Sequence, residues 1–253
     1  MSTSCTKPRI TVCGIPKLGE HSAAGVTHVL SILGPNAPDP PEFAAFAPHR
    51  RLILRFHDVI EPQPDQIAPT CEDVERLLVF GREVSESPEA HLLVHCRAGV
   101  SRSTAAAVLI LMQANPEWPA CAALDAVAAI RPRAWPNLLI LEFGDALLGR
   151  NGEIVTAAGA IYRRVLARDP EFGDQMIYAG RDRELSAAYA RPADPTQVFL
   201  SDRFGQFMCR HSNGRDRRYR GPSLDWEAAK SQNLAAGLRP YEEPFSALVR
   251  HPD

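Results

Sequence analysis

The sequence has no long apolar run and very little net charge. No stretch of about 18 apolar residues, the minimum for a membrane-spanning helix, occurs in the chain. The N-terminal segment, MSTSCTKPRI, lacks the apolar core of a secretory signal. Lysine and arginine total 28 against 30 aspartate and glutamate, which gives a formal charge of −2. We therefore expect neither a membrane nor nucleic acid as a partner.

Closely paired cysteines are absent as well. The cysteines include no C-x-x-C pair and stand at positions 5, 13, 71, 96, 121 and 209. In a chain of this size, scattered cysteines are typical of reduced thiols rather than of a disulfide framework. Cys209 and His211 have the spacing of two metal ligands, but no second pair accompanies them, so we expect no metal. This pattern predicts a cytoplasmic setting.

What the sequence does have is the composition and the alternation of a globular α/β protein. Hydrophobic residues make up 45% and charged residues 23% of the chain, which is enough for a sizeable core. Short apolar segments bounded by Gly and Pro predict strands at 9–15, 27–33, 50–56 and 91–96. Helical periodicity, or a continuous apolar run, predicts helices at 70–87, 103–113, 119–130 and 136–148. Because strands alternate with helices, we expect a central, mostly parallel sheet flanked by helices.

The alternating pattern fills residues 8–150, a normal size for one domain. We expect residues 151–253 to be a C-terminal extension with one amphipathic helix at 153–168. After about residue 170 the periodicity is weak, so the chain there is expected to be irregular or disordered. The arginines between 210 and 220 are best explained as a solvated run. The oligomeric state stays open.

One segment, HCRAGVSRS at 95–103, carries the chemistry. It lies between an apolar strand and an apolar helix, where successive backbone N–H groups and the helix N-terminus form an anion-binding cradle. The same field favours the thiolate form of Cys96 at the base of the cradle. Gly99 lets the backbone turn closely around the anion, where a Cβ would obstruct it. Arg102 closes the loop with a planar group that can bind two phosphate oxygens at once.

This segment resembles the H-C-x5-R-S/T signature of the protein tyrosine and dual-specificity phosphatase superfamily. The strand before it and the helix after it match the structural context of that signature. The resemblance covers residues 8–150 and implies a phosphotyrosine protein phosphatase-like fold there. It also implies a phosphomonoester hydrolase that acts through a phosphocysteine intermediate and needs no metal or organic cofactor.

The resemblance also implies a role for each residue of the motif. Cys96 would be the nucleophile, and Arg102 would bind the substrate and stabilise the transferring phosphoryl group. Ser103 would donate a hydrogen bond to the departing sulfur, and His95 would order the loop and favour the ionised thiol. The residues expected to bind phosphate mainly through backbone N–H groups are Arg97, Ala98, Gly99, Val100 and Ser101.

A leaving oxygen needs a proton donor on a separate loop. In this superfamily the donor is an aspartate upstream of the cysteine. Asp58 is the preferred candidate because it follows an apolar strand and precedes a helix that leads to the Cys96 strand. The spacing of the two residues is long for the smaller members, which leaves Asp65 as a competitor.

A second element, IRPRAWPN at 130–137, resembles the R-P-x-x-x-P-N segment of dual-specificity-like phosphatases. The resemblance makes Asn137 a candidate support for the phosphate loop, and the plainer alternative is that it caps a helix. No phosphotyrosine-recognition loop precedes Asp58, and the phosphate loop lacks the paired lysines of inositol-lipid phosphatases. The compact dual-specificity-like group therefore fits best.

Two other classes of function stay open at this point. The protein could be a non-catalytic phosphate-binding module, or the thiolate could serve arsenate reduction or sulfur transfer. The intact set of Cys96, Arg102 and Asp58 favours hydrolysis over both. The expected partner is a phosphorylated protein or a small phosphate ester, and the sequence does not choose between them.

Overall fold

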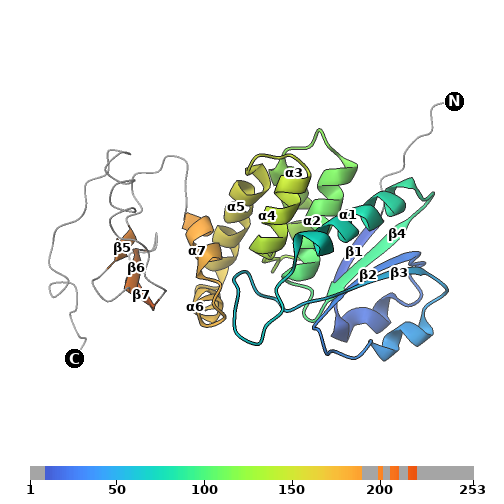
Figure 1. The fold of residues 1–253 in the computed structure, drawn as a ribbon, viewed down its shortest axis with the longest axis horizontal. Helices are drawn as coiled ribbons and strands as arrows, with labels where there is room; N and C mark the ends of the chain where they lie inside the picture. Colours follow the sequence, from blue (N-terminus) through green and yellow to red (C-terminus); the bar gives the residue numbers. More distant parts are fainter. Residues whose placement is uncertain (1–8, 190–198, 202–205, 211–215, 221–253) are drawn as a thin grey trace.

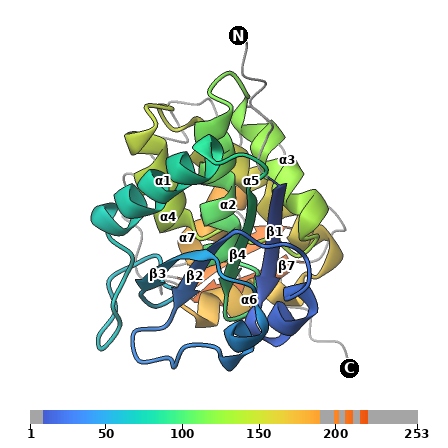
Figure 2. The same cartoon turned by 90° about the vertical axis from the view of Figure 1, so that its right-hand side faces the viewer.

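The structure, a computed structural model, describes residues 9–189 and three short segments at 199–201, 206–210 and 216–220. The main sheet has four parallel strands in the order β1-β4-β2-β3, which Figure 2 shows side by side. Its strands are β1 (Arg9–Gly14), β2 (His28–Leu33), β3 (Arg50–Arg55) and β4 (His91–Cys96). The predicted α/β fold with a central parallel sheet is confirmed.

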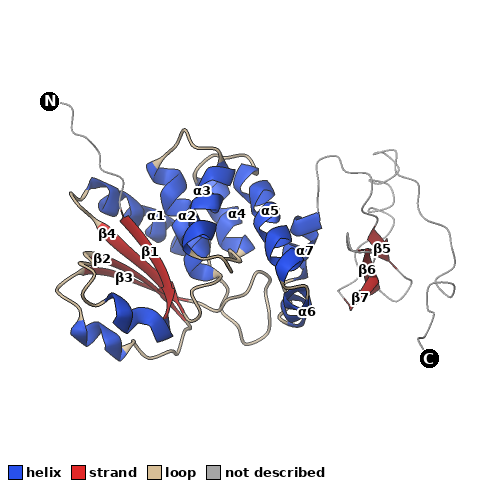
Figure 3. Ribbon diagram, turned by 180° about the vertical axis from the view of Figure 1, so that it is seen from behind, coloured by secondary structure: helices blue, strands red, loops and turns tan. Residues whose placement is uncertain are grey.

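The sheet is covered on both faces, as a parallel sheet requires. Every residue of β2 and of β4 is buried. Alternate residues of β4 point to opposite faces of the sheet. Leu92 and Val94 pack in the larger core beneath the α-helices, whereas Leu93 packs in a smaller core. The smaller core is closed by the 3-10 helices η1 (Ile15–His21) and η2 (Pro41–Ala45), on the other side of the sheet (Figure 3).

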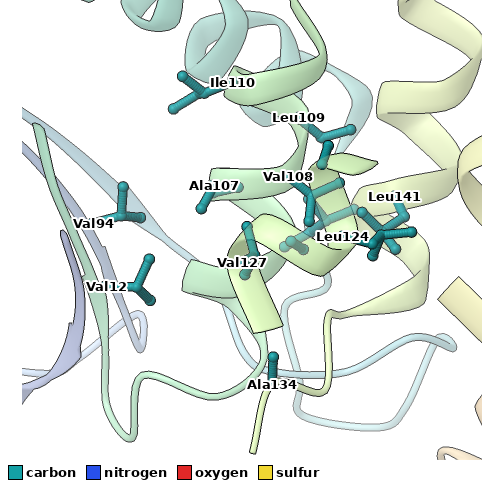
Figure 4. Close-up of a cluster of buried hydrophobic side chains, with 14 of the residues drawn as sticks. Val12, Val94, Ala107, Val108, Leu109, Ile110, Leu124, Val127, Ala134 and Leu141 are labelled. Carbon is teal, nitrogen blue, oxygen red and sulfur yellow. The ribbon is translucent and has the colours of Figure 1, made fainter. Parts of the chain in front are cut away.

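The predicted helices are present with bounds close to those expected. They are α1 (Cys71–Glu86), α2 (Arg102–Ala114), α3 (Ala120–Ile130), α4 (Leu138–Leu147) and α5 (Glu153–Arg168). A capping box of Thr70 and Asp73 fixes the start of α1. Helix α2 is buried along nearly its whole length, and Figure 4 shows its apolar side chains between the sheet and the neighbouring helices. Its apolar composition follows from this central position.

The prediction that the chain becomes irregular after about residue 170 is wrong for residues 171–189. They form two more helices, α6 (Glu171–Tyr178) and α7 (Asp182–Tyr189), beyond α5 in Figure 1. Each has only 8 residues, too few for a clear periodic signal. Apolar residues of α5 and α7 belong to the same buried core as α2. The predicted extension therefore begins inside the packed body rather than outside it.

Further along the chain, β5 (Phe199–Ser201), β6 (Gln206–Arg210) and β7 (Asp216–Arg220) pair as a small antiparallel sheet. The predicted disordered end at 221–253 lies outside the described residues, and so do the side chains of the arginine run and of Cys209 and His211. None of the helices that the structure describes is long and apolar enough to cross a membrane.

Candidate active site

The candidate site lies at the carboxyl edge of the sheet, where the central strand β4 ends. Cys96 is the last residue of β4 and Arg102 is the first residue of α2, so the connection between them is short and tightly curved. We call residues 96–102 the cysteine loop. Because β4 has β1 on one side and β2 on the other, the loop lies in the middle of the edge where ligands bind in open α/β sheets.

The carbonyl groups of residues 97–101 in the cysteine loop are bound from outside the loop. The contacts are Ile15 N to Arg97 O (3.1 Å), Arg131 to Ala98 O (3.1 Å) and Gly99 O (2.9 Å), Trp135 N to Val100 O (2.9 Å), and Ala105 N to Ser101 O (3.0 Å). A trans peptide unit points its N–H away from its C=O. The N–H groups of residues 98–102 therefore face the inside of the loop, which is the geometry of an anion cradle.

The structure gives a steric reason for glycine at position 99. Its φ is +68°, and a Cβ there would lie 2.3 Å from the backbone carbon of Cys13, at the end of β1. A Cβ on Gly14 would meet the backbone of Ala98 at 2.8 Å from the other side. The close approach of two backbones and the left-handed conformation therefore both require glycine here.

The sulfur of Cys96 lies among hydrogen-bond donors. Its Sγ accepts a hydrogen bond from the Gly99 N–H at 3.3 Å and lies 3.2 Å from Ser103 Oγ. Cys96 is 2% exposed, at the N-terminus of α2. The sulfur thus lies close to a backbone N–H group and to the first turn of α2. The structure thus brings Ser103 to the sulfur, as the sequence predicted.

His95 can order the loop, but it cannot act on the thiol through a positive charge. Burial, together with the charge of Arg51, lowers the pKa of His95 to about 4, so the ring is neutral at pH 7. Its Nε2 lies 2.6 Å from Ser31 Oγ, and Ser31 also accepts a hydrogen bond from Arg51 Nε at 2.8 Å. The expected influence on the thiol is therefore limited to the position of this ring.

Arg102 is buried and only partly bonded. Its Nη1 donates to the Phe56 carbonyl at 2.7 Å, and the residue is 6% exposed. Its Nε has no hydrogen-bond partner among the residues that the structure describes. A buried charged group with an unused N–H is rare and calls for a reason. An anion held by the cysteine loop would supply the missing acceptor.

Asp58 faces this region, and its two oxygens differ. Oδ1 accepts hydrogen bonds from Ser101 Oγ (2.7 Å), Asn137 Nδ2 (3.0 Å) and Arg181 Nη1 (3.1 Å). Oδ2 has no hydrogen bond within the described part of the chain and lies 3.9 Å from Arg102 Nε. Burial acts to raise the pKa of Asp58, but the charges of Arg181 and Arg102 and the bonds from Asn137 and Ser101 outweigh it and lower that pKa.

The competitor Asp65 has different surroundings. It is exposed, with a φ of 59°, and it does not line the cleft that contains Cys96 and Arg102, whereas Asp58 does. The structure brings together Asp58 with the cysteine loop and leaves Asp65 at the surface.

Asn137 has both roles that the sequence left open. Its side chain accepts a hydrogen bond from Ile140 N at 3.1 Å and so caps α4. Its Nδ2 donates to Asp58 Oδ1 and to the Val59 carbonyl at 3.1 Å, and its backbone N–H contacts the Ser101 carbonyl at 3.4 Å. Asn137 therefore supports the segment that carries Asp58 as well as the cysteine loop.

Sequence reasoning missed Arg181, just before α7. Its Nη2 donates to Ser101 Oγ at 2.9 Å, and it also binds the buried Glu184. Burial raises the pKa of Glu184, but both its oxygens accept only N–H donors, from Arg181, Trp135 and Leu138. A proton on either oxygen would find no acceptor, so we take Glu184 as a carboxylate. The weak periodicity of this region gave no signal for the pair.

The site opens into a cleft of about 780 Å³. The polar or charged residues that line it include Asp58, Cys96, Arg102 and Arg181. Its apolar walls are formed by Ile15, Leu33, Val100, Trp135, Phe172 and Met176. The last two belong to α6 and Arg181 lies just before α7, so the region after residue 170 contributes to the lining of the cleft.

No protein-family model and no curated protein matches this sequence. Among solved structures, the chain is similar to human DUSP28, with 18% identity and a TM-score of 0.44 over 57% of this chain and 96% of that one. It is similar to the PTP-2 phosphatase of Cydia pomonella, with 20% identity and a TM-score of 0.45 over 55% of this chain and 86% of that one. It is also similar to PTPMT1 in complex with PI(5)P, with 17% identity and a TM-score of 0.42 over 56% and 94% of the two chains.

Proposed function

We propose that this protein is a phosphomonoester hydrolase in which Cys96 forms a phosphocysteine intermediate. The observation that carries the proposal is the meeting of three groups at one cleft: the Cys96 sulfur, the buried Arg102 and the Asp58 carboxylate. The inward N–H groups of the cysteine loop support it, since they provide positive charge for a phosphoryl group without any metal.

In the first step, the Cys96 thiolate attacks phosphorus and the bond from phosphorus to the ester oxygen breaks. Asp58 gives its proton to that oxygen, which leaves as an alcohol or phenol. Arg102 and the loop N–H groups stabilise the charge on the three remaining oxygens. A bound phosphate dianion next to Asp58 favours its protonated form, against the effect of Arg181 and Arg102 on its pKa.

In the second step, a water molecule attacks phosphorus and the bond from sulfur to phosphorus breaks. The Asp58 carboxylate takes a proton from the water, and the products are phosphate and free Cys96. Ser103 Oγ, 3.2 Å from Cys96 Sγ, donates a hydrogen bond to the departing sulfur.

The cleft walls bear on the substrate class. The apolar side chains of Phe172, Met176 and Ile15 line the same cleft as the cysteine loop. An ester whose alcohol carries an aromatic or apolar group would bury that group there. We therefore propose a phosphorylated protein side chain or a small phosphate ester of this kind as the substrate. A reducing, cytoplasmic setting suits the mechanism because it depends on a free thiol.

The test compares the wild-type protein with Cys96→Ser on 4-nitrophenyl phosphate. We expect wild-type hydrolysis, inhibited by vanadate, and no hydrolysis by the variant. Tungstate should still raise the melting temperature of the variant, because the cradle is intact. Wild-type activity in the variant would refute the nucleophile. Tungstate binding without wild-type hydrolysis would point to a phosphate-binding module.

A further inference from the structure

The turn between α6 and α7 holds the loop that carries Asp58, residues 57–70, which we call the acid loop. Three contacts join them: Arg181 Nη1 to Asp58 Oδ1 (3.1 Å), Arg183 Nη2 to the Ile60 carbonyl (3.0 Å), and Gln63 Nε2 to the Ala179 carbonyl (3.3 Å). Arg183 also pairs with Glu61. A segment more than 100 residues further along the chain thus binds the acid loop at several points.

Arg181 is the innermost of these contacts. Its side chain is 4% exposed and that of Glu184 is fully buried. One edge of the guanidinium binds Glu184 through Nε (2.9 Å) and Nη2 (2.5 Å), and another reaches Asp58 and Ser101. A buried Arg–Glu pair is weak evidence for stability, because well-packed apolar residues often serve as well. The presence of a cation here therefore needs another explanation.

The arrangement of the bonds supplies one. Arg181 contacts Asp58 Oδ1 and Ser101 Oγ at the same time, and Ser101 Oγ itself donates to Asp58 Oδ1. These bonds join the acid loop to the cysteine loop at a single oxygen. The other oxygen, Oδ2, is left on the side of Arg102.

We propose that Arg181 is a positioning residue for proton transfer: its planar fork fixes Oδ1 of Asp58 against Ser101 and so presents Oδ2 to the bound phosphate ester. The inference rests on the proposed function. It assigns to the region after residue 170 a part in the chemistry.

Charge and geometry can be separated at this position. The groups that face Asp58 are Arg181 before α7, Arg102 at the start of α2, Ser101 in the cysteine loop and Asn137 at the start of α4. Loss of one cation makes the carboxylate less stable and raises its pKa. The acid would then stay protonated to higher pH, and the high-pH limb of the kcat/KM profile would move upward.

The experiment uses Arg181→Lys and Arg181→Met in the full chain. Lysine keeps the charge beside Glu184 but cannot hold two oxygens in one plane. We expect Arg181→Lys to lower the rate on phenyl phosphate, a poor leaving group, by about tenfold or more relative to that on 4-nitrophenyl phosphate, with little movement of the pH limb. Arg181→Met should move the limb to higher pH as well.

The matched control is Arg163→Met. Arg163 Nη1 donates to the Ala188 carbonyl at 2.7 Å, so this variant weakens the attachment of α7 without touching Asp58. This variant should keep the wild-type ratio of the rates on phenyl phosphate and 4-nitrophenyl phosphate. It should also keep the wild-type position of the high-pH limb of the kcat/KM profile. Thermal melting checks the fold. If Arg181→Met does not fold, the ratio of rates on the two substrates in Arg181→Lys tests the inference.

If the Arg181 variants keep both the wild-type ratio of rates on the two substrates and the wild-type high-pH limb, the inference is overturned while the proposed function stays intact. A wild-type protein without Cys96-dependent hydrolysis would remove both.

Discussion

The two carboxylate oxygens of Asp58 have different surroundings, which bears on how the residue could move a proton. Oδ1 accepts three hydrogen bonds, whereas Oδ2 accepts none in the described residues and faces Arg102. An oxygen with three donors is a poor place for a proton, since each donor would lose an acceptor. The proton should therefore reside on Oδ2 when Asp58 acts as an acid.

This asymmetry leads to a prediction for Asp58→Asn, with Asp65→Asn as its control. The asparagine carbonyl can still accept from Ser101 and Arg181, so the loops should stay in place. Without an acid, the rate on phenyl phosphate should fall by about 10²- to 10⁴-fold, and that on 4-nitrophenyl phosphate by much less. Steady-state kinetics on the two substrates measures the difference. Equal slowing, or a comparable effect in Asp65→Asn, would move the acid to another residue.

At the residue scale, the sequence predicted the residues of the short motifs, but it did not predict the hydrogen bonds between residues that are far apart in the chain. The motif at 95–103 and the order of Asp58 before Cys96 can be read along the chain. The bonds from Arg131 to the carbonyls of Ala98 and Gly99 join positions more than 30 residues apart. Arg131 begins the R-P-x-x-x-P-N segment, but the sequence does not say which carbonyl groups this arginine binds.

Among the elements, the helices after residue 150 complete the core around Trp135. Its fully buried ring lies between Tyr162 of α5 and Phe172 of α6, with ring centroids 4.5 Å and 5.1 Å away. The Tyr162 hydroxyl donates to the Pro136 carbonyl at 2.6 Å. The backbone N–H of Trp135 in turn donates to the Val100 carbonyl of the cysteine loop. Helices α5 and α6 thus support the loop that precedes α4 and, through it, the site.

This packing predicts the behaviour of two shortened chains. A chain ended after residue 150 loses the buried side chains of Ile154, Ile161 and Tyr162, each contributing roughly 1.5–3 kcal/mol. That loss is comparable with the whole stability of a typical domain, about 5–15 kcal/mol. We expect the chain ended after residue 150 to show no cooperative melting transition and no hydrolysis.

A chain ended after residue 189 should keep both the transition and the activity, because it retains α5 to α7. Thermal melting followed by circular dichroism, with an aryl phosphate assay, compares the two. Wild-type melting and activity in the chain ended at 150 would contradict this account.

On the scale of the whole molecule, the strands and the first five helices could be predicted because each carries its own periodicity and its own boundary residues. The α6–α7 segment could not, since its helices are short and its packing depends on residues far away in the chain, such as Trp135 against Phe172. The expected division at residue 150 was placed where the alternation of strands and helices ends. What joins the two parts is a core and a set of polar contacts that form only in three dimensions.

The central claim is that phosphorus becomes bonded to the Cys96 sulfur, and Ser103→Ala gives the most direct test. Without the Ser103 hydroxyl, the sulfur should leave more slowly, so the intermediate should accumulate. Acid quenching during turnover of 4-nitrophenyl phosphate, followed by mass spectrometry, should find one phosphoryl group on the peptide that contains Cys96. Turnover with no phosphoryl group on that peptide, or with one on another residue, would contradict the mechanism.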